Sequence, residues 1–430
     1  MLRSALLAIL TLTASPLLGG EFFTLSGHGG PIKGIASDAS GRIATASFDN
    51  SVGYWRDGQP QWLEAHAAAV NAVAFVDANT LVSAGDDFAL YHWDIATSTA
   101  RLMGHHKGKI MSLAVSPSGT TVASASWDGT IGLWPLDGDT PQFLTGHASS
   151  VNDVVFTPDG QGLYSASADG SIRFWDVATG QQKAQVLAGG FGINTLALAP
   201  DANWLAYGAV DGVTRIIDPN SGALIKDFTL ERRPILAMAL DASGQTLAVG
   251  DGQGYISALN TADWSLLADF RATQRGPIWA LAFSPDGSNI HAGGLDDTLY
   301  SWPLNGPKDA QMTLADAAFL QGSEASNRGE HQFNRKCSIC HSLTADSQRR
   351  AGPTLQNLFG RPAGTVPGYI YSETLQTSPI IWGAETIDAL FDLGPDVYIE
   401  GTKMPVQRIT DPEDRAALIA FLRSHSTPQE

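Results

Sequence analysis

The chain has 430 residues, of which 43% are hydrophobic and 16% are charged, a composition typical of ordered globular domains and not of disordered chains. At roughly 150 residues per domain, the length predicts two or three domains. The formal net charge of −17 argues against a general binder of nucleic acid or of anionic membranes, because such proteins need a basic face.

Residues 1–20 are typical of a secretory signal. Arg3 provides a short positive region, an apolar stretch follows over residues 6–12, and Pro16 interrupts it. This stretch is shorter than the roughly 20 residues that span a bilayer, so an uncleaved anchor is the weaker alternative. We expect cleavage near Gly20–Glu21, export from the cytoplasm, and no membrane span in the mature chain.

Residues 21–306 contain a repeat with a period near 41 residues. The tryptophans at 55, 93, 134 and 175 are spaced by 38, 41 and 41 residues, and the series continues at 217, 259 and 302, which makes seven units. In the first four units an aspartate lies six residues before the tryptophan, and a histidine lies further upstream. These sets are His28, Asp49 and Trp55; His66, Asp87 and Trp93; His105, Asp128 and Trp134; His147, Asp169 and Trp175.

Each unit contains short apolar runs, such as Val151–Phe156 and Gly162–Ala166, separated by turn signals. Four short strands with tight turns form a small sheet that cannot bury its faces alone, so the units should stack radially. The His, Asp and Trp of a unit, with a serine such as Ser126 or Ser167, can form a hydrogen-bonded chain within one blade. We therefore assign these residues structural roles.

This pattern resembles the WD-repeat family of β-propellers over about two-thirds of the chain. The resemblance implies an all-β, seven-bladed propeller in which the segment near residues 21–25 completes the last blade. Units five and six have lost the histidine and the tryptophan. His92, His106 and His291 lie outside the pattern, and they are the candidate ligands if the propeller binds a metal or a second cofactor.

The composition changes after Trp302, which predicts a linker over residues 307–322 and a separate domain with helical periodicity over residues 323–430. Its segment Cys337-Ser338-Ile339-Cys340-His341 is a C-x-x-C-H motif, which attaches c-type haem. The two thiols can bond the two vinyl groups of one porphyrin, with His341 beneath the iron. A zinc site lacks a second cysteine pair, and a redox dithiol lacks the surrounding βαβ pattern. Haem attachment also suits export, and it favours the bacterial periplasm.

Further segments follow the haem motif in a fixed order. They are Gly352-Pro353, Leu358-Phe359-Gly360-Arg361, Pro367–Ser372, Trp382 and Gly401–Pro405, and Asp411 and Pro412 then open a final helix. This string is similar to class I, mitochondrial-type cytochrome c over residues 323–424.

The resemblance implies an all-α domain with one covalent haem c whose iron is ligated by His341 and Met404. It implies that the Pro353 carbonyl orients His341, and that the haem propionates are bonded or shielded by Arg361, Tyr371, Trp382 and Thr402. Ligation by His and Met gives a relatively high reduction potential and leaves no open iron position.

Two departures from the family follow from the sequence. Phe391 lies where the family has a tyrosine that hydrogen-bonds the axial methionine, so we expect looser or retuned ligation by Met404. The family's ring of docking lysines is also reduced to Lys336 and Lys403. Service to a standard terminal oxidase is therefore not expected.

The favoured function is single-electron transfer through the haem, with the propeller docking a protein redox partner and no catalytic residues of its own. Residues 1–322 carry a net charge of −14 and residues 323–430 a net charge of −3, which predicts a cationic docking face on that partner. The alternative is an oxidoreductase whose propeller holds a second cofactor or a substrate. A redox sensor and a peroxidase are lesser hypotheses.

Overall fold

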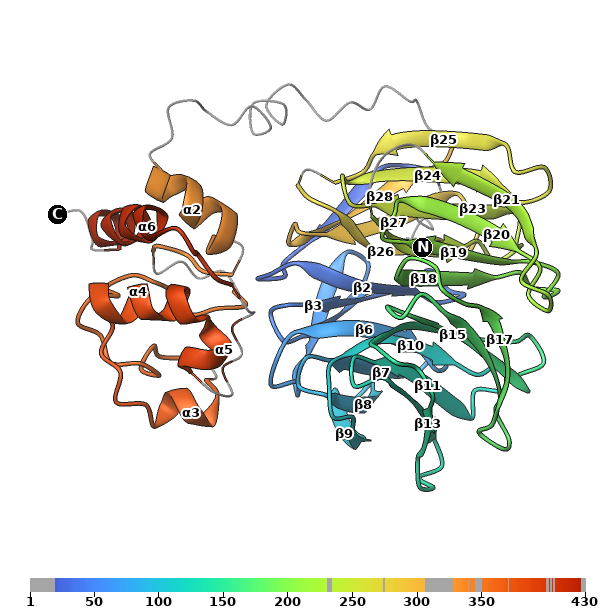
Figure 1. Cartoon of the computed structure of the whole chain (residues 1–430), viewed down its shortest axis with the longest axis horizontal. Helices are drawn as coiled ribbons and strands as arrows, with labels where there is room; N and C mark the ends of the chain where they lie inside the picture. The colour runs from blue at the N-terminus through green and yellow to red at the C-terminus, as the bar shows by residue number, and fades with distance from the viewer. Residues whose placement is uncertain are drawn as a thin grey trace, which may run out of the picture.

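The fold is known from a computed structural model, which describes residues 20–229, 234–273, 275–305, 328–338, 340–344, 350–369, 371–399, 402, 404 and 407–426. The expected signal segment up to residue 19, the expected linker and Lys403 lie outside these residues. The described chain forms a β-propeller followed by a smaller helical domain (Figure 1). Both classes of fold agree with the sequence expectation.

The propeller has seven blades of four antiparallel strands each, with the first strand of each sheet innermost. Blade 1 consists of β2 (Ile32–Ser37), β3 (Ile43–Ser47), β4 (Val52–Arg56) and β5 (Gln59–Leu63). Blade 2 consists of β6 (Val70–Phe75), β7 (Thr80–Gly85), β8 (Ala89–Asp94) and β9 (Thr99–His105). Blade 3 consists of β10 (Ile110–Val115), β11 (Thr121–Ser126), β12 (Thr130–Pro135) and β13 (Gln142–Thr145). Blade 4 consists of β14 (Val151–Phe156), β15 (Gly162–Ser167), β16 (Ile172–Asp176) and β17 (Gln182–Leu187). Blade 5 consists of β18 (Ile193–Leu198), β19 (Leu205–Ala209), β20 (Val213–Ile217) and β21 (Leu224–Thr229). Blade 6 consists of β22 (Ile235–Leu240), β23 (Thr246–Asp251), β24 (Tyr255–Asn260) and β25 (Leu266–Arg271). Blade 7 consists of β26 (Ile278–Phe283), β27 (Asn289–Gly294), β28 (Thr298–Pro303) and β1 (Phe23–Ser26).

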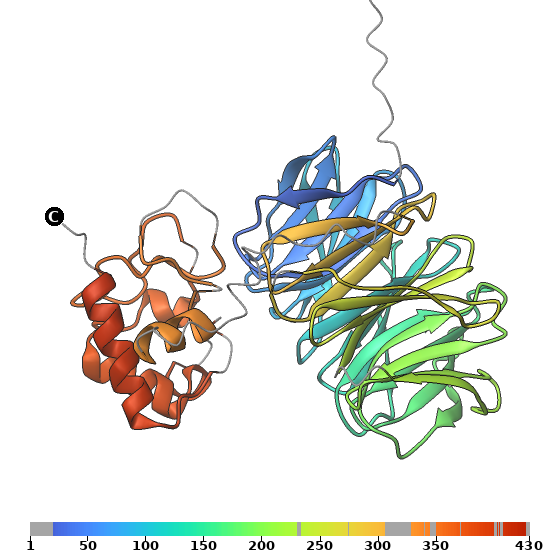
Figure 2. The same cartoon turned by 90° about the horizontal axis from the view of Figure 1, so that it is seen from above.

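The ring closes by pairing the two ends of the propeller sequence. Strand β1 pairs antiparallel with β28, with Phe23 opposite Ser301 and Leu25 opposite Leu299 (Figure 2). The N-terminal strand therefore completes the last blade, which confirms the expected closure. Because closure leaves no open end of the ring, each blade buries both faces against a neighbour.

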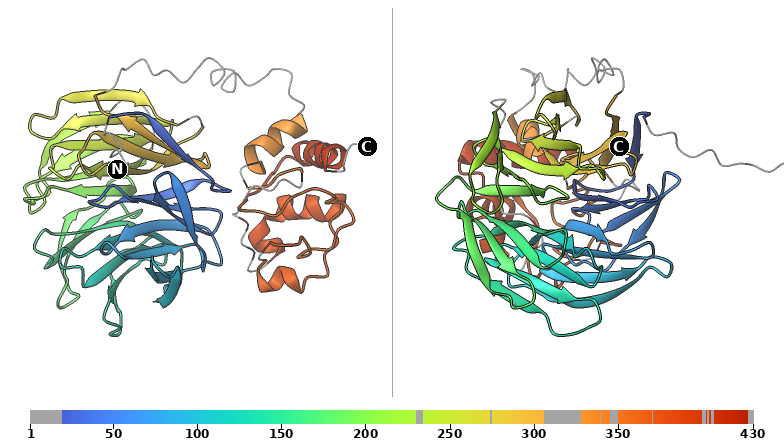
Figure 3. Two further views of the ribbon diagram at one scale, coloured as in Figure 1. Left: turned by 180° about the vertical axis from the view of Figure 1, so that it is seen from behind. Right: turned by 90° about the vertical axis from the view of Figure 1, so that its right-hand side faces the viewer.

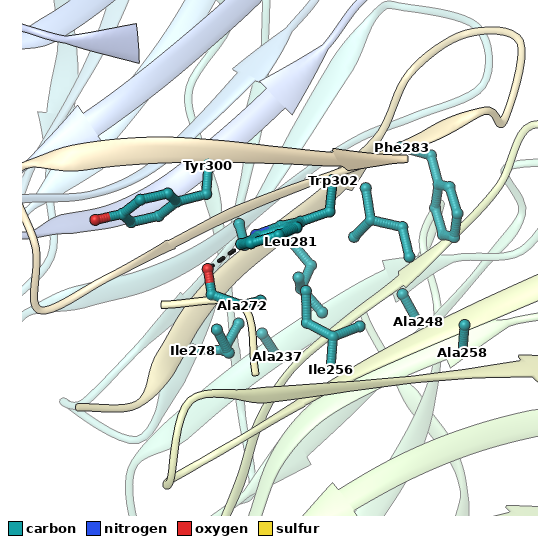
Figure 4. Packing of buried hydrophobic residues seen from close by; sticks show 12 residues of the cluster. Ala237, Ala248, Ile256, Ala258, Ala272, Ile278, Leu281, Phe283, Tyr300 and Trp302 are labelled. Carbon is teal, nitrogen blue, oxygen red and sulfur yellow. Dashed lines mark hydrogen bonds between the residues drawn. The ribbon is translucent and has the colours of Figure 1, made fainter. Parts of the chain in front are cut away.

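Apolar side chains fill the spaces between neighbouring blades. Between blades 6 and 7, Ile256, Ile278 and Leu281 pack beside Trp302, whose indole N–H donates to the Ala272 carbonyl at 2.9 Å (Figure 4). The tryptophan thus provides both apolar surface and a hydrogen bond, which is the usual requirement for burying an indole.

All seven inner strands carry a register shift after their first paired residue, as between Ile32 and Gly34 in β2. In three blades the residue skipped by the pairing is an asparagine. The side-chain amides of Asn71, Asn152 and Asn194 donate to inner-strand carbonyls of the following blade at 3.0, 2.8 and 2.8 Å. The shift therefore frees a side chain that joins one blade to the next.

A chain of polar side chains fixes each of the first four blades. In blade 3, His106 Nδ1 donates to Asp128 at 3.0 Å, and Ser124 lies 2.7 Å from both His106 Nε2 and the indole nitrogen of Trp134. Blades 1, 2 and 4 repeat this arrangement. The structural roles of the three histidines 28, 66 and 147 are confirmed, as are those of the aspartates and tryptophans of the four sets.

The predicted role of His105 is wrong. His105 is exposed on β9, and the neighbouring His106 is the buried partner of Asp128. The separation of 22 residues between His106 and Asp128 equals that between His147 and Asp169, so this spacing identifies His106 as the partner of the aspartate. The predicted serines are also wrong by two positions. Ser126 and Ser167 accept backbone hydrogen bonds in the turns, whereas Ser124 and Ser165 are the hydroxyl members of the hydrogen-bonded side-chain sets.

The turn aspartates are buried acceptors with several donors. Burial alone would raise the pKa of Asp49, but hydrogen bonds from His28 and Ser51 and the nearby imidazole lower it to about 2. The carboxylate also accepts the backbone N–H of Gly29 at 2.9 Å. This carboxylate therefore ties the loop that enters blade 1 to the turn between β3 and β4.

The helical domain contains α2 (Arg328–Lys336), α3 (Glu373–Gln376), α4 (Ala384–Leu393), α5 (Pro395–Tyr398) and α6 (Pro412–His425). Helices α2 and α6 lie side by side (Figure 3), and the rings of Phe333 and Phe421 are 5.4 Å apart. A Cβ atom at Gly329 would lie 2.1 Å from the Ala417 carbonyl oxygen, so this crossing requires glycine. Asp411 caps α6 by accepting the Glu413 N–H, with Pro412 in the first turn, as predicted.

Replacing each of the two neighbouring histidines in turn tests the assignment of His106 as the buried partner of Asp128. We expect His106→Ala to lower the free energy of unfolding of the propeller by about 2–4 kcal/mol, because it removes the imidazole that bonds both Asp128 and Ser124 inside the blade. His105→Ala is the matched control and should change it by about 0.5 kcal/mol or less. Urea titration of the full-length protein measures both. A larger loss for His105→Ala would contradict the assignment.

Candidate functional site

The C-x-x-C-H segment follows α2 directly and folds into a tight turn. The N–H of Cys337 donates to the Phe333 carbonyl at 2.8 Å, and the N–H groups of Cys340 and His341 donate to the Cys337 carbonyl at 3.1 and 2.9 Å. All three side chains line one cavity. The turn thus presents two thiols and an imidazole to the same space, as a covalently held porphyrin requires.

Before a haem is attached, both thiols are protonated at neutral pH. Burial raises the pKa of Cys337 to about 12 and that of Cys340 to about 11. Redox-active dithiols instead have lowered pKa values, because the thiolate is the reactive form. The surroundings of this pair therefore favour covalent attachment over the dithiol alternative.

His341 is oriented for binding a metal through one nitrogen. Its Nδ1 lies 2.7 Å from the Pro353 carbonyl, which can only accept, so Nδ1 carries the proton and Nε2 keeps its lone pair. Burial lowers the pKa of His341, so the ring is neutral. A Cβ atom at Gly352 would lie 2.4 Å from His341 Cε1, so only glycine allows this packing. The expected role of Pro353 agrees with this geometry.

Met404 and Thr402 line the same cavity as His341. The Met404 N–H donates to Thr402 Oγ1 at 3.2 Å. Thr402 thus has a direct part in holding the methionine backbone, which the sequence did not predict. Its predicted role near the propionates stays a prediction.

Arg361, Tyr371 and Trp382 also line the cavity, as the family resemblance implied. Two guanidinium nitrogens of Arg361 donate to the backbone carbonyls of Gln356 and Thr354 at 2.6 and 2.8 Å. Burial lowers the pKa of this guanidinium, although it stays a cation at neutral pH. A fixed, half-buried cation at the wall of the cavity suits an anionic group of the ligand.

The remaining cavity wall is mostly apolar. It includes Leu355, Leu358, Ile387, Leu390, Phe391, Ile399 and Leu422, and the polar residues Tyr369 and Ser372. The Tyr369 hydroxyl donates to the Ala351 carbonyl at 2.7 Å. Ser372 Oγ is buried, and within the described residues it has no hydrogen-bond partner. Tyr369 and Ser372 stand in the predicted segment Pro367–Ser372, but neither was assigned a role of its own.

These residues fit a haem c. The cavity opens at one side, and the space between its side chains is about 1240 Å³ when the solvent at its mouth is included. The set of two thiols, one imidazole nitrogen and one thioether matches covalent attachment with His and Met ligation. The buried Ser372 hydroxyl can donate to an oxygen of the group.

Two of the three propeller histidines outside the predicted pattern take part in hydrogen bonds within their blades. His106 belongs to the blade 3 chain, and His291 is buried with its Nδ1 3.0 Å from the Ser301 hydroxyl. Burial lowers the pKa of His291 to about 4. Within the part of the chain that the structure describes, no group of three or more His, Cys, Asp or Glu side chains is placed to hold a metal ion.

Phe391 offers a test of the axial methionine. It is buried on α4 and lines the cavity with Met404. We expect Phe391→Tyr to add a donor for the thioether and to weaken the binding of added imidazole to the oxidised iron about fivefold, which corresponds to one hydrogen bond of about 1 kcal/mol. Optical titration with imidazole measures this. Phe391→Leu is the control, and equal affinities for the two variants would contradict the role of position 391.

Comparison with known proteins identifies both parts of the chain. A family model for "WD domain, G-beta repeat" matches residues 19–56, 59–94, 96–135, 138–176 and 264–303. A model for "Cytochrome c" matches residues 326–426. Blades 5 and 6, which have lost the histidine and tryptophan, are largely outside the repeat matches, yet they form complete four-stranded sheets.

Plant cytochromes c are similar to the C-terminal domain. The chain is 43% identical to cytochrome c of Sesamum indicum over 97 residues, which cover 22% of this chain and 85% of the relative. It is 39% identical to cytochrome c of Ginkgo biloba over 102 residues, 24% of this chain and 88% of the relative. For cytochrome c of Arabidopsis thaliana the identity is 36% over 115 residues, 27% of this chain and 99% of the relative.

Proposed function

This chain belongs to the cytochrome c family through its C-terminal domain, and we propose that it carries single electrons while its WD-repeat propeller docks a protein redox partner. The observation that carries the proposal is the single cavity lined by Cys337, Cys340, His341 and Met404. The domain carries one covalently attached haem c, as the family does. When bound, this group supplies a one-electron couple at its iron.

The side chains around the cavity favour electron transfer over substrate chemistry. Pro353 holds the His341 ring, and Thr402 holds the backbone of Met404, so the imidazole nitrogen and the thioether would be the groups that hold the haem iron. Most of the cavity wall is apolar. Ligands held by hydrogen bonds and an apolar wall would reduce the rearrangement that accompanies each change of charge, which suits a carrier of single electrons.

The propeller has exposed aromatic side chains where its turns and loops leave the sheets. Because neighbouring strands are antiparallel, the turns between the second and third strands and the loops that enter the inner strands emerge on one face, which we name the top face. Phe88, Trp127 and Phe191 lie there with 38%, 47% and 62% of their surfaces exposed. Exposed aromatic residues are typical of protein interfaces. They support a partner docking on this face.

Charge indicates the kind of partner. Residues 1–322 have a net charge of −14, so a cationic protein would be attracted over a distance of about 30 Å at about 10 mM salt. We expect the second-order rate constant for electron exchange with a basic redox protein to fall at least tenfold when the salt concentration rises from about 10 to about 200 mM, because screening of the attraction becomes strong over roughly this range. Stopped-flow absorbance on the full-length protein measures it.

An acidic redox protein of similar potential is the matched control. Its rate constant should rise with added salt, because screening then reduces repulsion. If the basic protein also reacts faster in salt, or if neither rate changes, the proposed cationic partner is wrong.

We further propose that the protein is exported to a bacterial periplasm. Support comes from the signal-like first twenty residues and from the start of the fold, where the Glu21 carbonyl accepts from the Asn289 amide at 2.8 Å and β1 begins at Phe23. Cleavage near Gly20 would leave β1 intact. Among the described helices, none is both long and apolar enough to cross a membrane.

N-terminal sequencing of the haem-containing protein tests the location. We expect a mature chain that begins near Glu21, recovered in the periplasmic fraction of a bacterium that matures c-type cytochromes. A chain that keeps Met1 and stays with the cytoplasmic fraction would contradict export.

A further inference from the structure

The mouth of the haem cavity faces the propeller. Four propeller residues line it, namely Phe48 and Asn50 of the turn between β3 and β4, Ala69 just before β6, and Asp86 of the turn between β7 and β8. We name these four residues the cavity cover. All belong to the top face of blades 1 and 2, so residues far apart in the sequence complete the wall of one cavity.

Direct contacts join the two domains beside the cover. The Ala351 N–H donates to the Gly29 carbonyl at 3.0 Å, and a Cβ atom built on Gly30 would lie 3.1 Å from the Ala351 Cβ. The Ala351 carbonyl accepts the Tyr369 hydroxyl, and Pro353, two residues later, holds His341. The contact is therefore made by the segment that positions the axial histidine.

The propeller side of this contact is held firmly in place. Asp49 accepts the Gly29 N–H at 2.9 Å, and Ser47 Oγ donates to the Gly30 carbonyl at 3.0 Å. The Phe48 ring stacks on Trp279 of blade 7 with centroids 5.6 Å apart. A surface fixed in this way loses little conformational entropy when another domain rests on it.

Asp86 is the charged member of the cover. Its carboxylate accepts the Asn71 amide at 2.8 Å and the Lys109 ammonium at 2.5 Å. Asn71 is the residue that the register shift of β6 leaves unpaired, and it also joins blade 2 to blade 3. The position of the carboxylate thus depends on the architecture of the ring and not on a mobile surface loop.

We propose that the top face of blades 1 and 2 is a built-in docking surface for the haem edge, and that Asp86 is a positioning residue for the redox equilibrium of the haem. The inference rests on the haem-carrying role proposed above, but it does not depend on the identity of any partner. The cover shields the side of the haem that its own domain leaves open. An external protein then exchanges electrons beside or through the propeller.

The charge of Asp86 should shift the reduction potential of the haem in one direction. The oxidised haem carries one more positive charge than the reduced haem, so a nearby carboxylate stabilises the oxidised form. Lys109 offsets part of this effect. Removing the carboxylate charge should therefore raise the reduction potential, provided that the propeller stays docked.

A cross-link tests the contact. In the full-length, haem-loaded double variant Gly30→Cys/Ala351→Cys, the Cβ atoms would lie close to the roughly 3.5–4.5 Å separation of a disulfide. We expect peptides containing positions 30 and 351 to remain joined after proteolysis without reductant and to separate after reduction. The control is Gly30→Cys/Ala416→Cys, since Ala416 is exposed on α6 and this helix lies on the side of the domain away from the propeller (Figure 2).

A redox titration tests the effect of the Asp86 charge on the reduction potential. It uses a variant without added cysteines, so it remains valid even if the cysteines of the cross-linking variant disturb haem attachment. We expect Asp86→Asn to raise the midpoint potential of the full-length protein. The control is Asp211→Asn, which removes another turn aspartate paired with a cation, Arg215, from blade 5. Free thiols at 30 and 351 in the haem-loaded monomer, or equal potentials for the two Asn variants, would overturn the proposal. Absence of covalent haem would instead overturn the proposed function.

Discussion

The burial of a carboxylate in the turn of a blade is the constraint on which much of this molecule depends. A buried charge is stable only when donors surround it, and Asp49 obtains them from the His28 ring, the Ser51 hydroxyl and the Gly29 N–H. These donors come from two loops that are about twenty residues apart in the sequence. The same set of bonds therefore shapes the blade and fixes the loop on which the second domain rests.

Four blades could be predicted from the sequence because this constraint leaves a periodic trace. The aspartate, histidine and tryptophan of each of these blades recur at nearly fixed separations, and the seven-bladed ring with its closing strand followed from the family resemblance that this pattern carries. The error at His105 arose from two adjacent histidines, of which the separation from Asp128 selects His106. Blade 5 uses a different solution, in which Asp211 keeps its place six residues before position 217 but pairs with Arg215 in place of a histidine.

The C-terminal site could be predicted in its ligands but not in its surroundings. The residues of the C-x-x-C-H segment, Pro353, Arg361 and Met404 belong to one continuous order of motifs, and the structure brings them to one cavity. Tyr369 and Ser372 lay inside a recognised segment without a role. Phe48 and Asp86 could not be found, because their place at the cavity depends on how two separate domains meet, and neither residue differs from an ordinary turn residue in its local sequence.

Attachment of the haem domain to a fixed surface changes what limits electron exchange. In a free carrier the open edge of the haem must find a partner by diffusion, and long-range charge guides that search. Here the C-terminal domain has a net charge of only −3, whereas residues 1–322 carry −14. Since the propeller also covers the mouth of the cavity, both the guidance of a partner and the final approach to the haem fall to the propeller. Partner selection can then change with the surface loops of the blades, while the ligands at the iron stay the same.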